Sequence, residues 1–174
     1  MAAYGGIQYI KFERNEDVVL KRINIGRDKL NELNDLLLMF YTGIERKSVD
    51  IHKEQSNNIE ANRSGYDRMR DIALETSKVM KENDFLELGK LMDENWGIKK
   101  RLSKDISQST INKWYSDAVD AGAIGGKLMG AGGGGFLLFL TPVEKQKMVM
   151  NALHDLERHR IQIENFGSRV VYLE

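Results

Sequence analysis

Residues 123–140 read AIGGKLMGAGGGGFLLFL, and this stretch decides how the chain folds. Of the 16 glycines in the 174 residues, eight lie between Gly122 and Gly135. Glycine accepts positive φ angles, and it lets other groups approach the main chain without a Cβ in the way. The run Phe136–Leu140 that follows is short and apolar, which predicts a buried strand. A glycine loop that leads into a sheet is therefore expected at the centre of this domain.

The glycine loop does not fit the three common phosphate-binding loops. Gly130, Gly132 and Gly135 satisfy G-x-G-x-x-G, but a dinucleotide site needs a strand before the loop and a helix after it. The sequence indicates a helix before these glycines and a strand after them. A Walker A loop ends in Lys-Ser/Thr, whereas Lys127 precedes the glycines. The motifs that accompany a protein-kinase loop are absent. A tight crossing, in which the glycines only allow close packing, is the structural alternative.

The flanking sequence predicts an α+β domain. Polar residues at 84 and 87 form a D-x-x-E start for one helix, Gly122 is placed to end another, and Thr141, followed by Pro142, predicts a capped helix start. A mostly antiparallel sheet with a helical layer on one face follows from this order. The expected elements are a hairpin over 7–25, a strand over 36–41, helices between 44 and 121, a strand over 136–140, a helix from 143, and strands at 161–163 and 170–173.

Composition excludes several classes of function. The 26 Lys and Arg balance 26 Asp and Glu, which argues against a nucleic-acid partner or an anionic membrane surface. There is no cysteine, and the three histidines are scattered, so no metal site is predicted. The longest apolar runs fall far short of the roughly 18 residues that span a bilayer. A cytoplasmic location is the simplest expectation.

Three segments resemble the GHMP small-molecule kinases. Residues 125–136 resemble the third, C-terminal motif of that family, and residues 40–55 and 95–106 resemble its sugar-kinase branch. Within this branch the sequence is most similar to D-glycero-D-manno-heptose 7-phosphate kinases, with fucose-type kinases as the nearest competitor. The resemblance implies a ferredoxin-like C-terminal domain over 27–174, preceded by a hairpin over 1–26 that belongs to the end of the N-terminal kinase domain.

The resemblance also implies a reaction. Such kinases transfer the γ-phosphoryl group of ATP, in the presence of Mg²⁺, to the anomeric hydroxyl of a sugar phosphate. The ATP loop and the catalytic aspartate of the family belong to the N-terminal half, so that half is the expected partner and this chain alone is expected to be inactive. A homodimer is possible. A non-catalytic ligand-binding or dimerisation module with the same fold is the alternative.

The resemblance places the site in the glycine loop and beside it. No catalytic residue and no metal ligand is assigned. Lys127 either adds a point charge near the phosphate or forms an ordinary surface ion pair. Arg46 is either a bidentate phosphate ligand or a solvated residue of the next helix, and Thr42 could offer a hydroxyl to the same ligand. The loop expected next to the transferred phosphate consists of Gly130, Ala131, Gly132, Gly133, Gly134 and Gly135.

Overall fold

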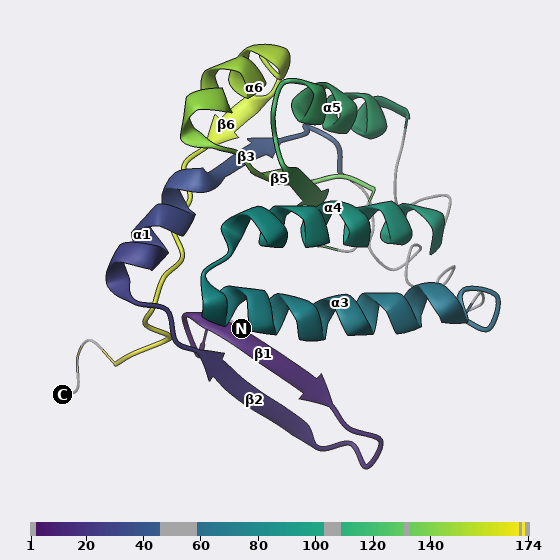
Figure 1. Ribbon diagram of the computed structural model, residues 1–174, viewed down its shortest axis with the longest axis vertical. Coiled ribbons are helices and arrows are strands. Elements are labelled where there is room, and N and C mark those ends of the chain that lie inside the picture. The colour runs from purple at the N-terminus through teal and green to yellow at the C-terminus, as the bar shows by residue number, and fades with distance from the viewer. Residues whose placement is uncertain (1–2, 46–58, 103–108, 131–132, 171, 173–174) are drawn as a thin grey trace.

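The computed structural model describes residues 3–45, 59–102, 109–130, 133–170 and 172. Its centre is a four-stranded antiparallel sheet in the order β4-β5-β3-β6, with helices around it and a separate hairpin below α3 (Figure 1). The strands of the sheet are β3 (Leu37–Tyr41), β4 (Gly125–Leu128), β5 (Phe136–Leu140) and β6 (Glu157–His159). The helices are α1 (Arg27–Leu36), α3 (Arg63–Glu82), α4 (Phe85–Leu102), α5 (Ser109–Asp120), the 3-10 turn η1 (Val143–Lys145) and α6 (Gln146–Ala152).

The order of the strands is that of a ferredoxin-like fold. The chain leaves β3 and returns through helices to the far edge as β4, and β5 then inserts between β3 and β4, antiparallel to both. After α6 the chain adds β6 at the other side of β3. Each half is thus a β-helix-β unit whose two strands are separated by a third strand. The predicted fold class, an antiparallel sheet covered by helices, is confirmed.

The hairpin forms a second sheet of its own. Strands β1 (Ile7–Phe12) and β2 (Val18–Ile23) pair antiparallel, and the turn between them has Glu16 at φ 69°. The hairpin packs against α3 (Figure 1). The C-terminal segment also contacts the hairpin, because Arg22 of β2 donates a hydrogen bond of 2.8 Å to the carbonyl of Asn165. The division into 1–26 and 27–174 stays a prediction, although the hairpin lies outside the main sheet.

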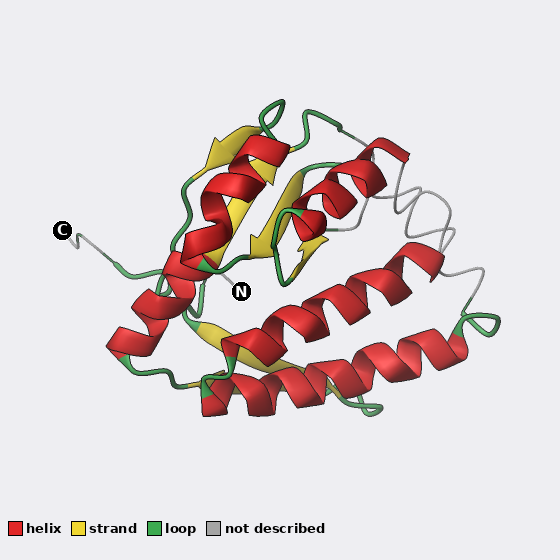
Figure 2. Cartoon of the chain, turned by 45° about the horizontal axis from the view of Figure 1, so that its top comes forward, coloured by secondary structure: helices red, strands yellow, loops and turns green. Residues whose placement is uncertain are grey.

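One hydrophobic core joins the sheet to its helices. Figure 2 shows α5 and α6 side by side across the strands, and α4 packs on β4. Trp96 of α4, Ile111 of α5 and Val149 of α6 are fully buried together with side chains of the strands. The buried strand residues include Leu38, Phe40, Leu128, Leu137 and Phe139. Their alternation with less buried neighbours is the pattern of strands with one face on a core.

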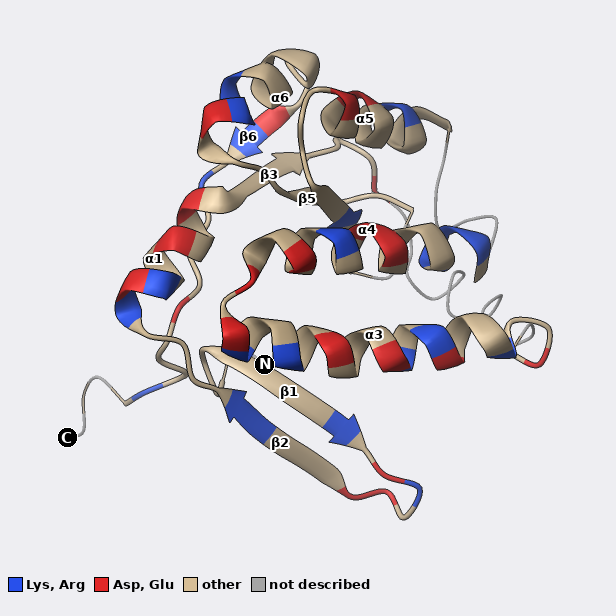
Figure 3. Ribbon diagram, viewed as in Figure 1, with Lys and Arg blue, Asp and Glu red and all other residues tan. Residues whose placement is uncertain are grey.

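Several expected helix ends are present. The Asp84 side chain accepts a hydrogen bond of 3.0 Å from the N–H of Glu87, which caps the start of α4. Gly122 has φ 113°, and Ala123 N–H bonds the carbonyl of Ala118 at 3.0 Å, which closes the end of α5. Charges of both signs alternate along α3 and α4 (Figure 3). None of the helices in the described part of the chain is long and apolar enough to cross a membrane.

Two strands differ from the sequence prediction. The stretch before the glycine loop is not all helix and turn: β4 precedes the loop directly, so the loop joins two antiparallel strands. Glycine is depleted from strands. Because β4 begins with Gly125 and Gly126, its sequence does not predict a strand. At the C-terminus, residues 161–163 form no strand, and neither does the described part of 170–173. The last strand is β6 instead, formed by polar residues that gain order from pairing with β3.

Two helix predictions also need correction. Helix α1 was not predicted, although Leu30 and Leu33 are buried at helical spacing. The start of the α6 region is not capped by Thr141, because its Oγ1 is buried and has no hydrogen-bond partner among the described residues. Pro142 occupies the cap position, with an extended ψ of 139°. Tight packing of Thr141, which has no exposed surface, prevails over the local capping preference. The helix predicted to begin near 44 falls mainly on residues outside the described part.

Candidate functional site

The glycine loop turns the chain sharply between two strands. The N–H of Met129 bonds the carbonyl of Phe136 at 2.8 Å, which closes the base of the loop. Gly130, Gly133 and Gly135 have φ angles of 80°, 78° and 98°, where a side chain would be strained. Open space lies beside the Cα atoms of Gly130 and Gly135. The loop therefore needs glycine for its backbone conformation, and it presents bare main chain to its surroundings.

The end of β3 holds the far side of this loop. The N–H and the Oγ1 of Thr42 each donate to the carbonyl of Gly135 at 2.8 Å, and Gly135 N–H bonds the carbonyl of Ile44 at 2.9 Å. A Cβ on Gly134 would collide with the same carbonyl of Ile44. Thr42 is almost fully buried. The hydroxyl therefore donates its proton to the loop. In the predicted contact with a ligand, Thr42 could only accept a hydrogen bond through its oxygen.

The glycines of β4 have a different role. A Cβ on Gly125 would collide with the carbonyl of Gly89 in α4, and one on Gly126 would collide with the carbonyl of Leu138 in β5. Gly89 itself faces Ile124, where a Cβ would lie 2.6 Å from the Ile124 side chain. Helix α4 consequently approaches β4 more closely than any larger residue allows. For this pair of glycines the close-packing alternative of the sequence analysis is correct.

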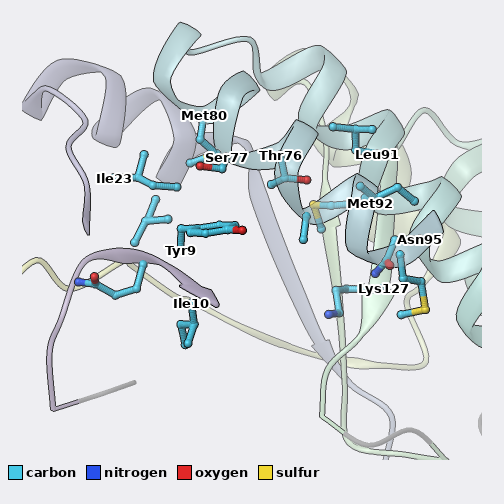
Figure 4. A pocket seen from close by; sticks show the side chains of 15 residues that line it. Tyr9, Ile10, Ile23, Thr76, Ser77, Met80, Leu91, Met92, Asn95 and Lys127 are labelled. Atoms are coloured by element: carbon cyan, nitrogen blue, oxygen red, sulfur yellow. The ribbon is translucent and has the colours of Figure 1, made fainter. Parts of the chain in front are cut away.

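Lys127 lies on the α4 side of β4. Side chains alternate between the two faces of a strand, and Gly125, two residues earlier, faces α4. Lys127 lines the end of a cleft of about 330 Å³ between the hairpin, α3 and α4, next to Asn95 (Figure 4). Most of the cleft is apolar, with Tyr9 and Ile23 from the hairpin and Met69 from α3. Burial lowers the pKa of Lys127.

A second lysine reaches the loop from α4. Lys99 Nζ donates a hydrogen bond of 2.6 Å to the carbonyl of Gly130. Burial first, and then the charge of Lys127, lower the pKa of Lys99 to about 8. Within the described residues neither ammonium group forms an ion pair with a carboxylate. The predicted surface ion pair of Lys127 is therefore not seen there, and the two lysines, which we call the lysine pair, lie together beside the start of the glycine loop.

A buried tyrosine fixes the strand that carries Lys127. The Tyr115 hydroxyl accepts the N–H of Gly126 at 3.0 Å and lies 3.1 Å from the Gly126 carbonyl. It also donates to Asp93 Oδ1 at 2.7 Å. Burial, with a further contribution from Asp93, raises the pKa of Tyr115, so the hydroxyl stays protonated. One side chain thereby joins α5, α4 and the outer edge of β4.

The structure brings only part of the predicted site together. Gly130, Gly133, Gly134, Gly135, Lys127 and Thr42 converge on one end of the sheet. Arg46, Ala131 and Gly132 lie outside the described residues. Sequence reasoning missed Lys99, which is distant from the loop in the chain. The available signal was its position one helical turn after Asn95, which places both polar side chains on one face of α4.

The described part of the site offers features suited to a phosphate. Backbone with positive φ, open space at Gly130 and two cationic side chains fit the phosphate groups of ATP or of a phosphorylated acceptor. Among the residues that the structure describes, no group of three acidic or histidine side chains could hold a metal ion.

Comparison with known proteins agrees with this geometry. A D-glycero-alpha-D-manno-heptose 7-phosphate kinase of Campylobacter jejuni is 28% identical over 154 residues, which cover 87% of this chain and 45% of that protein. A mevalonate kinase of Pyrococcus abyssi is 39% identical over 87 residues, which cover 50% of this chain and 24% of that protein. This chain therefore spans less than half the length of the curated relatives it matches.

A solved structure and a family description point the same way. The crystal structure of a putative sugar kinase from Campylobacter jejuni is 25% identical, with a TM-score of 0.67 over 95% of this chain and 48% of that one. Residues 76–158, which include α4, α5, the glycine loop and β5, match the family described as GHMP kinases C terminal. The motif, the strand order and the relatives agree with this match, so residues 76–158 carry the C-terminal domain of the GHMP kinase family.

Proposed function

We propose that this chain is the C-terminal part of an ATP-dependent kinase that phosphorylates the anomeric hydroxyl of a heptose 7-phosphate. The observation that carries the proposal is the extent of the similarity to the Campylobacter jejuni heptose 7-phosphate kinase, which covers 87% of this chain. The similarity to a mevalonate kinase covers only half of it. The sequence outside this shared half supports a sugar acceptor.

The residues of this chain would position the reactants. In the transfer, the anomeric oxygen forms a bond to the γ-phosphorus, the bond from that phosphorus to the β-phosphate oxygen breaks, and ADP leaves. Such reactions depend mainly on alignment and on stabilisation of the phosphoryl charge. The glycine loop supplies bare backbone, and the lysine pair supplies positive charge beside it. Arg46 is proposed as a further ligand of the sugar phosphate.

The other half of the reaction centre is assigned to a partner segment. In this proposal the N-terminal half of the kinase supplies the ATP loop, the aspartate that takes the hydroxyl proton, and the groups that hold Mg²⁺. The chain by itself is then inactive. The cytoplasmic location and a homodimer remain predictions that accompany this proposal.

The test uses a protein in which this chain follows a GHMP N-terminal half. ADP release would be measured with heptose 7-phosphate, with L-fucose and with mevalonate as acceptors. We expect turnover with heptose 7-phosphate, and loss of at least a hundredfold in kcat/KM for Gly133→Val, because valine is strained at the positive φ of this position. Lys90→Met, at an exposed site on α4, is the matched control.

Other outcomes identify the alternatives. Turnover with L-fucose and none with heptose 7-phosphate would assign the chain to a fucose-type kinase. No ATP turnover with any of the three acceptors, in a protein that is folded by circular dichroism, would contradict the kinase proposal. In that case a non-catalytic binding or dimerisation module is the remaining function.

A further inference from the structure

Lys99 and Lys127 meet without an acidic partner among the described residues. Several exposed lysines do pair with carboxylates, as Lys29 does with Glu32 and Lys113 with Asp117. Lys99 and Lys127, by contrast, are partly buried, and no ion pair joins either to the described acidic residues. Placing two like charges together in a partly desolvated position disfavours their charged forms. A bound anion would relieve both the repulsion and the desolvation.

The surroundings of the lysine pair indicate where such an anion would lie. Lys127 points into the cleft from β4 beside Asn95 (Figure 4). Lys99 follows Asn95 by one helical turn, and its Nζ is fixed 2.6 Å from the carbonyl of Gly130. The open space beside Gly130 lies at the same end of the strand. The two ammonium groups and the exposed backbone of the loop therefore lie next to the same space, where an anion would bind.

We propose that Lys99 and Lys127 together form a binding site for a phosphoryl group at the junction of the cleft and the glycine loop. The rest of the cleft is mainly apolar, with Thr76 and Ser77 as hydroxyl groups on α3. The ligand is thus a phosphate ester whose anionic end meets the lysines and whose remainder lies toward the hairpin. Lys99 is the new element, since its contact to Gly130 couples the helix to the loop.

The phosphate could belong to the nucleotide or to the acceptor. This distinction rests on the proposed function, whereas the binding of a phosphoryl group does not. The site is therefore tested first with inorganic phosphate on the 174-residue chain, by calorimetry at pH 7 and with chloride at matched ionic strength. The variants are Lys99→Met and Lys127→Met, and Lys90→Met is the control on the same helix.

We expect the wild-type chain to bind phosphate, each of the two variants to bind at least tenfold more weakly, and the control to bind within twofold of wild type. Circular dichroism establishes that each variant is folded, and methionine keeps most of the apolar length of lysine. Absence of phosphate binding by the wild-type chain would overturn the proposal. Unchanged affinity in both Lys99→Met and Lys127→Met would overturn it as well.

Two further titrations identify the source of the phosphate. The same variants are titrated with ATP and with heptose 7-phosphate, with the unphosphorylated heptose as a reference. Weaker binding of heptose 7-phosphate alone assigns the lysines to the acceptor, and weaker binding of ATP alone assigns them to the nucleotide. If neither ester loses affinity, the lysine pair serves no substrate phosphate and the proposal is wrong. All these titrations measure binding and not turnover, so a negative result would contradict the phosphate site without contradicting the proposed reaction.

Discussion

The glycines of β4 and those of the loop that follows it are close in sequence but serve opposite purposes. Gly125 and Gly126 lie in extended strand and are needed because neighbouring main chain occupies the space of a Cβ. Gly130 and Gly135 have open space beside them and are needed because of their positive φ angles. A single glycine-rich motif thus combines a packing contact with a turn, and open space lies only beside the turn.

The largest effect is expected where the packing contact is broken. Gly125→Ala places a Cβ against the carbonyl of Gly89, and helix backbone cannot move aside without disturbing the core. We expect a loss of about 3 kcal/mol in the free energy of unfolding, measured by urea denaturation. Gly97→Ala on the same helix is the control, because its Cβ would meet only a flexible arginine end at 3.9 Å. Equal effects of the two substitutions would refute the packing role.

The next largest effect concerns the hydrogen bonds at the outer edge of β4. Tyr115→Phe removes the hydroxyl that serves both main-chain groups of Gly126 and the carboxylate of Asp93. Leaving buried polar groups unpaired costs about 2 kcal/mol, and we expect a loss of that size in thermal or urea unfolding. Tyr66→Phe on α3 offers a control tyrosine. A Tyr115→Phe protein as stable as wild type would show that water replaces the hydroxyl.

A smaller effect is expected in the loop. Gly130→Ala meets no steric contact but must adopt a φ of 80°, which costs about 1 kcal/mol for an alanine. Gly130→Asn should cost less, since asparagine tolerates the left-handed region better. The order glycine, asparagine, alanine in unfolding free energy would separate backbone strain from packing. An alanine variant as stable as the asparagine variant would contradict this explanation.

The smallest effect has the opposite sign. The pKa of Lys99 is lowered to about 8 from 10.5, so between these pH values the unfolded chain binds more protons than the folded one, and this group adds stability as pH rises. Below pH 8 its charge is a penalty. Lys99→Met should therefore stabilise the chain at pH 7, by less than about 1 kcal/mol because solvent still screens this partly buried charge.

The pH dependence of this difference supplies the check. Melting temperatures of wild type and Lys99→Met, compared from pH 7 to pH 10.5, should converge as the wild-type lysine loses its proton. Added phosphate at pH 7 should raise the wild-type melting temperature more than that of the variant. A variant less stable than wild type at pH 7 would mean that the hydrogen bond to Gly130 outweighs the burial of the charge.

Sequence reasoning found the parts of the fold that have strong periodic patterns. The apolar runs that became β3 and β5, the hairpin, and the helices of the proline-free segment were all predicted, because burial alone specifies such patterns. Strand β4 was missed since two of its four residues are glycines, whose place in the sheet is fixed by α4 and Tyr115. The polar β6 was missed because its order comes from pairing with β3.

The site was predictable to a similar extent. The loop glycines and Lys127 lie within one motif, so the sequence alone indicated them. The positions of Lys99 and of the Thr42 hydrogen bonds to Gly135 depend on contacts between segments far apart in the chain. No local sequence pattern predicts such contacts. The close approach of α4 to β4, itself a result of glycines at both surfaces, is what brings the second lysine to the loop.

The central position of β3 has a consequence for synthesis of the protein. Tyr41, at its end, pairs with Phe136 on one side and with Glu157 on the other, so both neighbours of this strand emerge from the ribosome about a hundred residues later. At roughly 5–20 residues per second, β3 waits on the order of 5–20 s with both edges unpaired. Helices α3 and α4 are made during that interval and can pair with each other early. The unpaired edges of β3 are therefore open to aggregation until β5, which follows the glycine loop, has been translated.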